Sequence, residues 1–103
     1  MGVHIALKRI VSIEQELTWG GKIIPCAVTE DLDFDTVRHA GDKEFVLGVE
    51  FVDLEDPYYV RPMSINSAKE WVKENIQQNL QKRLLDALVA MEKDTNICFK
   101  FSY

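Results

Sequence analysis

The segment from Ser67 to Glu92 restricts the possible folds more than any other part of this 103-residue sequence. It contains no glycine or proline, and it is rich in Lys, Glu, Gln, Leu and Ala, which lose little side-chain freedom in a helix. Ser67 followed by Glu70 fits a capping box at the start of a helix. The pattern predicts a single helix over residues 67–92, roughly 39 Å long at 1.5 Å per residue. Its apolar residues recur at helical spacing, at Val72, Ile76, Leu80, Leu84, Leu88 and Met91.

A helix of this length needs an apolar surface to lie on, and alternating segments elsewhere in the chain predict the strands of a sheet. Residues 3–19 alternate for seventeen positions and are rich in β-branched side chains. Because seventeen residues is long for one strand, we expect a bend or a bulge near Arg9 or Ser12.

A hairpin follows this first strand. The Gly-Gly pair at residues 20–21 predicts a two-residue turn, since glycine takes positive φ at little cost. With that loop length Leu17 lies opposite Ile24, and the apolar residues of both strands share one face. Pro25 cannot donate a ladder hydrogen bond, so the second strand is expected at a sheet edge or with a local break.

The remaining segments predict one helical turn and three more strands. Asp33 or Asp35 would cap a short helical turn over residues 36–39 that Gly41 ends. Residues 44–54 alternate with apolar side chains on both faces, as is typical of a central strand. Residues 58–60 predict a brief strand that ends at Arg61-Pro62, and residues 97–103 predict a closing strand.

These elements define an α+β fold in a single domain, residues 1–103. We expect a mostly antiparallel, four- to five-stranded sheet with the one long helix packed on one face, in the order β-β-short α-β-α-β. Apolar residues surround most of the helix in its second half. Either two surfaces bury that part of the helix, or some of it contacts a partner. These residues are Leu84, Leu85, Leu88, Val89 and Met91.

The net charge of −5 is distributed unevenly. Ten of the 17 acidic residues but two of the 12 basic residues lie between Glu30 and Asp56, so this segment carries −8 and the rest of the chain +3. Concentrated negative charge attracts positively charged partners. It disfavours nucleic-acid binding, which needs clustered Lys and Arg.

The two cysteines and the apolar pattern indicate a cytoplasmic protein. Cys26 and Cys98 each fall in a strand-like segment, and we expect both to be reduced core residues. We find no signal-peptide pattern and no apolar run long enough to span a membrane. We therefore predict no membrane association.

Metal, cofactor and catalytic sites are not predicted. Asp31, Asp33 and Asp35 resemble the start of a calcium loop, but the later positions that need glycine and glutamate hold Thr36 and Asp42. His4, His39, Cys26 and Cys98 lack the spacing of zinc ligands or of a Cys-His nucleophilic pair. No glycine-rich phosphate loop is present.

Function is therefore expected to reside in protein binding. The first hypothesis is an inhibitor, such as an immunity protein or antitoxin that neutralises a basic, nuclease-type toxin, or a phage anti-defence protein, acting by charge-complementary occlusion. The alternative is a small structural or assembly subunit of a phage or a secretion system that self-associates, so the chain would be a monomer or a homodimer. The residues expected to contact a basic partner are acids and one aromatic, Asp31, Asp33, Asp35, Asp53, Glu55, Asp56 and Tyr58.

Overall fold

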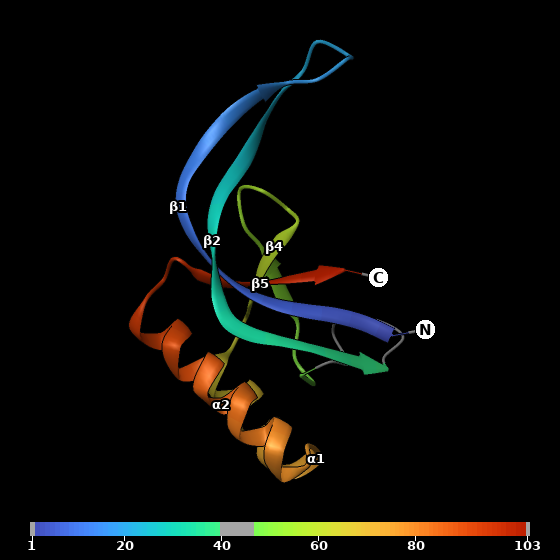
Figure 1. The fold of residues 1–103 in the computed structure, drawn as a ribbon, viewed down its shortest axis with the longest axis vertical. Coiled ribbons are helices and arrows are strands. Elements are labelled where there is room, and N and C mark those ends of the chain that lie inside the picture. Colours follow the sequence, from blue (N-terminus) through green and yellow to red (C-terminus); the bar gives the residue numbers. More distant parts are fainter. Residues whose placement is uncertain (1, 40–46, 103) are drawn as a thin grey trace.

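The computed structural model describes residues 2–39 and 47–102 of the chain, with the side chains of residues 4–34 and 47–102. These residues form the predicted α+β fold, an antiparallel five-stranded sheet with two helices (Figure 1). The strand order is β2-β1-β5-β4-β3. In chain order the elements are β1 (Gly2–Leu17), β2 (Ile23–His39), β3 (Phe51–Asp53), β4 (Tyr59–Pro62), α1 (Ile65–Asn75), α2 (Gln78–Lys93) and β5 (Ile97–Ser102).

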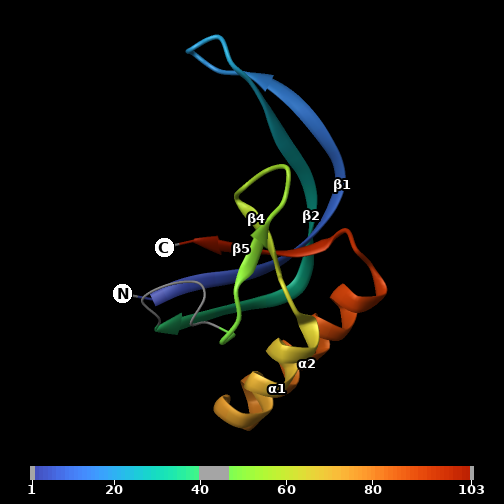
Figure 2. The same ribbon diagram turned by 180° about the vertical axis from the view of Figure 1, so that it is seen from behind.

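The hydrophobic core lies at one end of the molecule. Both helices lie side by side below the sheet, at the end opposite the β1–β2 turn (Figures 1 and 2). Phe99 of β5 is fully buried at the centre and contacts the ring of Phe51 edge-on at 6.5 Å between centroids. Each large apolar side chain buried in this way contributes about 1.5–3 kcal/mol. The core combines Ile5 and Leu7 of β1, Val60 of β4 and Ile97 of β5 with Val72, Leu84, Leu88 and Met91 of the helices.

The prediction of a single helix over residues 67–92 is correct about helical content but wrong about continuity. The backbone is extended at Ile76 (φ −111°, ψ 138°), and α2 folds back alongside α1. The Gln81 side chain donates to the backbone carbonyl of Lys73 at 2.9 Å, which satisfies a group at the end of α1. The start differs too, because Ser64 caps α1 by accepting from the Ser67 backbone N–H at 3.2 Å. The expected Ser67–Glu70 capping box is therefore wrong.

The β1–β2 hairpin exists, but its turn has three residues instead of two. Thr18 N–H donates to the Lys22 carbonyl at 2.8 Å, and Gly21 N–H donates to the Thr18 carbonyl at 3.0 Å. Gly21 has φ +78°, the left-handed conformation that three-residue hairpin loops require. The longer loop shifts the pairing by one residue, so that Leu17 lies opposite Ile23.

Two other features of the hairpin agree with prediction. The strand pairing shifts between Ala6 and Lys8 and between Ile10 and Ser12, close to the expected bend. The second strand lies at the sheet edge, as Pro25 indicated.

The segment after the hairpin differs from prediction. Residues 36–39 continue β2, with Thr36 opposite Ile5, and do not form the expected helical turn. Pairing with β1 gives this segment inter-strand hydrogen bonds, which outweigh a local cap at Asp33 or Asp35. The expected helix stop at Gly41 lies outside the described residues.

The predicted central strand over residues 44–54 is correct only at residues 51–53 where the structure describes it, and that strand is not central. Residues 47–49 form a turn in which Gly48 has φ +65°, and β3 is a three-residue strand at the other sheet edge. The ring of Trp71 occupies the space where a side chain at position 48 would begin. The central strand is β5, while the predicted strands at 58–60 and 97–103 correspond to β4 and β5.

Candidate functional site

The part of the hairpin that extends beyond the packed sheet is the most distinctive surface of the molecule. β1 pairs with both β2 and β5 only from His4 to Arg9; beyond Ile10 its one pairing partner is β2. We call residues 11–28, which contain both strand ends and the loop between them, the arm. The arm curves away from the helices in both views (Figures 1 and 2). It explains why a 103-residue chain measures 46 Å along its longest axis.

Large apolar side chains are exposed on the arm. Of the ten such side chains that are exposed among the described residues, six belong to the arm. Leu17 and Ile23, which face each other across the two strands, are 74% and 68% exposed, and Trp19 in the loop is fully exposed. Scattered exposed apolar residues are ordinary, whereas their concentration on one projecting element is typical of binding surfaces. The other three are Val11, Ile24 and Val28.

The register of the two strands divides the arm into two faces that differ in charge. Residues directly opposite each other share a face, and alternate residues along each strand do too. One face carries no ionisable group, and we call it the uncharged face. The other, the acidic face, carries Glu14 and Glu16 beside Ile24 and Cys26. The uncharged face is formed by Ile13, Gln15, Leu17, Ile23, Pro25 and Ala27.

The acidic face controls the chemistry of Cys26. Its thiol donates to the Glu16 carboxylate at 2.8 Å. This hydrogen bond is the largest of the causes that raise the pKa of Cys26 to about 11, with smaller contributions from desolvation and from the negative charges of Glu16, Asp56 and Glu14. The thiol therefore stays protonated at neutral pH and is a poor nucleophile. Cys26 and Cys98 are both free thiols. Cys98 is buried in the core as expected, whereas Cys26 is half-buried on the arm, so the expected core position is wrong for Cys26.

The outer edge of β2 is protected against pairing with another strand. Asp56, in the turn between β3 and β4, is 7% exposed and accepts from the backbone N–H of Ala27 at 2.9 Å and of Tyr58 at 3.1 Å. The next N–H on the same side of β2 would belong to residue 25, which is proline and has none. Both features close a strand edge. The arm is therefore available for contact through its faces and its tip.

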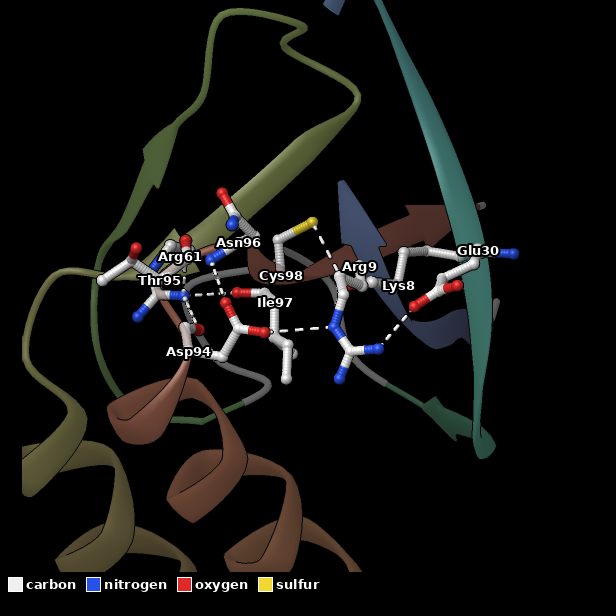
Figure 3. Close-up of polar contacts among 9 residues, drawn as sticks. All are labelled: Lys8, Arg9, Glu30, Arg61, Asp94, Thr95, Asn96, Ile97 and Cys98. Atoms are coloured by element: carbon white, nitrogen blue, oxygen red, sulfur yellow. Dashed lines mark hydrogen bonds and ion pairs between the residues drawn. The ribbon is translucent and has the colours of Figure 1, made fainter. Parts of the chain in front are cut away.

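A polar network fixes the base of the arm to the body (Figure 3). Arg9 of β1 forms ion pairs with Glu30 of β2 and, at 3.1 Å, with Asp94 at the end of α2. The hydrogen bond to Glu30 is the main reason that the pKa of Arg9 is raised. The backbone N–H of Asn96 is the main reason that the pKa of Asp94 is lowered, and Arg9 lowers it further.

Arg61 of β4 completes this network (Figure 3). Its guanidinium donates to the carbonyl of Met91 at 2.8 Å and to that of Thr95 at 3.2 Å. It also donates to the carbonyls of Asp94 and Ile97. The last turn of a helix leaves carbonyls without helical partners, and the Met91 carbonyl is one of these in α2. By donating to it, Arg61 of β4 links the helix to the sheet. The network therefore has a structural role and leaves the arm to project from a firm base.

The seven residues predicted to contact a basic partner do not form one surface of equal exposure. Asp31 is ion-paired with Lys8, as the neighbouring Glu30 is with Arg9. Asp56 is buried and holds the β2 edge. Asp33, Asp53, Glu55 and Tyr58 are exposed, the last three around the β3–β4 turn. Asp35 belongs to β2, and its side chain lies outside those described.

Sequence reasoning missed the arm, although the signal was present. A strand of 16 residues spans roughly 53 Å at 3.3 Å per residue, which exceeds the diameter of a compact domain of this size. Part of such a strand must extend beyond any core that the chain can build. The one-residue error in register also placed Leu17 and Ile24 on one face, whereas they lie on opposite faces of the arm.

Within the described residues, no three His, Cys, Asp or Glu side chains are arranged to hold a metal ion, and no helix has the length and apolar character needed to cross a membrane. Comparison of the chain with protein family models, curated proteins and solved structures gave no match. The function is therefore inferred from the residues themselves.

Proposed function

We propose that this protein acts by binding another polypeptide through its arm, as a small structural or assembly subunit does. The observation that carries the proposal is the exposure of Leu17, Trp19 and Ile23 at the end of a ribbon that the core does not cover. Aromatic and large aliphatic residues of this kind anchor protein interfaces, and each contributes about 1.5–3 kcal/mol once it is fully buried.

The construction of the arm supports contact through side chains. The closed edge of β2 opposes strand addition, while Asp56 and the Arg9 network hold the base of the arm in place. A binding element that is held in position before contact loses less conformational entropy on binding. The arm therefore combines an apolar contact surface with a fixed position.

The test is the size of the native complex in extracts of the source cells. The wild-type chain is expected to elute in a complex larger than 11.9 kDa, and a Leu17→Ser, Ile23→Ser double variant is expected to elute as the free chain. Lys82→Ser on the exposed side of α2 is the matched control and should behave as wild type. If the double variant elutes with the wild type, the arm is not part of the interface.

A second candidate is the charge-complementary inhibitor of a basic, nuclease-type toxin or a phage anti-defence protein. The observation that favours it is the β3–β4 turn, where Glu55 and the 72% exposed Tyr58 lie close to Asp53. The ion pairs of Glu30 and Asp31 weigh against it, since these two charges are already compensated. An Asp53→Lys, Glu55→Lys variant that still binds a basic partner, with unchanged salt dependence, would contradict this candidate.

A further inference from the structure

We infer that the uncharged face of the arm docks on the same face of a second copy of this chain, about a two-fold axis that passes beside Gln15. The inference rests on the proposed function and specifies its partner. Three independent features of the arm lead to it, namely the distribution of charge, the order of side chains along the face, and the position of Trp19.

The charge distribution favours a partner that covers one face. A cleft that enclosed the arm would remove Glu14 and Glu16 from water, and each buried carboxylate without a partner costs several kcal/mol. A second copy that covers only the uncharged face leaves both carboxylates in solvent. It buries no ionisable group of either chain.

The order of side chains makes the uncharged face complementary to itself. The Leu17–Ile23 pair lies toward the tip, Gln15 with Pro25 in the middle, and Ile13 with Ala27 toward the base. A two-fold axis at the middle places the bulky tip pair of one copy over the base pair of the other. It also places Gln15 against its own copy, where each amide can donate to and accept from the other.

The same arrangement accounts for Trp19 and Val11. Each is four residues from Gln15 along the chain, in opposite directions, with Trp19 in the turn and Val11 at the register shift between Ile10 and Ser12. Trp19 of one copy therefore lies toward the same end of the contact as Val11 of the other, whose side chain is 60% exposed in the single chain. The contact would cover Trp19 and Val11, while the exposed Ile24 and Val28, on the acidic face, stay in water.

The contact area indicates a weak, reversible dimer. Five residues of a two-stranded ribbon form a footprint of about 17 by 10 Å. Even with Trp19 added, this is below the roughly 800 Å² per partner that stable complexes bury. Association should accordingly depend on protein concentration and change little with salt, because no ion pair is involved.

Cross-linking of the purified full-length protein tests the geometry. Gln15→Cys in a Cys26→Ser background should give a covalent dimer with a short bis-maleimide that spans the ~10 Å between packed sheets. Glu16→Cys in the same background, one residue away on the acidic face, is the matched control and should stay monomeric. Dimers from Glu16→Cys, or none from Gln15→Cys, would overturn the inference.

Sedimentation velocity over a range of concentrations tests the same contact without a reagent. The wild type should show concentration-dependent dimerisation, and Leu17→Glu should weaken it by at least about tenfold, since it would place a carboxylate on the covered face. Circular dichroism checks that the variant is folded. A strictly monomeric wild type, or a dimer unaffected by Leu17→Glu, would overturn the inference.

The two proposals fail in different ways. If the purified protein is monomeric but the double variant still loses its complex in extracts, the arm binds a different protein and the second copy is excluded. If neutral phosphatidylcholine vesicles bind the purified wild type, but not Leu17→Glu, a lipid surface and not a second copy occupies the arm. If the wild type is a monomer in sedimentation and also elutes as the free chain from extracts, the proposed function fails as well.

Discussion

The two halves of β1 share one alternating sequence pattern and have opposite surroundings. From His4 to Arg9 the strand has neighbours on both sides and helices beneath, and Ile5 and Leu7 are 1% and 6% exposed. From residue 11 onward it has one neighbour, and Leu17 is 74% exposed. Alternation therefore establishes a strand with an apolar face, while other elements decide whether that face belongs to the core or is left for a partner.

The largest difference between the halves should appear when the same side chain is truncated in each. Leu7→Ala in the helix-covered half should lower the free energy of unfolding by about 2–5 kcal/mol, since it removes buried contacts and leaves a cavity. Leu17→Ala on the arm should change it by less than about 0.5 kcal/mol in dilute solution. Urea unfolding monitored by circular dichroism measures both free energies. A comparable loss of stability from Leu17→Ala would show that Leu17 is packed in the core as the covered half is.

A prediction of this kind depends on the structure, because only part of the architecture could be predicted from the sequence. The strand content, the edge position that Pro25 indicates and the closing strand all follow from local patterns. The break at Ile76 and the three-residue turn do not follow from local patterns. Each depends on tertiary packing, of α2 beside α1 in the first case and of β1 against β2 in the second. Counting charges along the sequence predicts a partner surface made of acids. In the fold, Asp31 and Glu30 are ion-paired with Lys8 and Arg9, and Asp56 is buried.

The next effect concerns how the helices are held beneath the covered half. Arg61→Ala should cost about 2–3 kcal/mol, because a charged donor to several carbonyls at the end of α2 is lost. Lys82→Ala, exposed on the same helix, should stay within about 0.5 kcal/mol. Urea unfolding of both variants gives the comparison. Equal stability of the two would show that the carbonyls find other donors.

A smaller effect is expected where the arm joins the body. Asp56→Ala should cost about 1–2 kcal/mol, since the backbone N–H groups of Ala27 and Tyr58 lose their acceptor. Amide hydrogen exchange should also become faster at Ala27 than in the matched variant Glu55→Ala, whose carboxylate is exposed. Unchanged protection of Ala27 would mean that the arm does not depend on this attachment.

The smallest effect is chemical and confined to the arm. With its pKa raised from 9.0 to about 11, Cys26 should have roughly 100-fold less thiolate at pH 8 and react correspondingly slowly with iodoacetamide. Because folding raises this pKa, the Glu16 contact stabilises the fold fully below pH 9, and its contribution disappears as the pH rises through 11. Glu16→Gln should speed alkylation, as measured by mass spectrometry of the Cys26 peptide. Equal rates in the two proteins would show that Glu16 does not control the thiol.

The most direct test of the arm as the binding element is photo-cross-linking in the source cells. A photoreactive amino acid is placed at position 19 in one variant and at position 82, exposed on α2, in another. The account predicts a discrete covalent adduct from position 19, with a second copy or with another protein, and none from position 82. Adducts from position 82 alone would contradict it and place the interface on the helices.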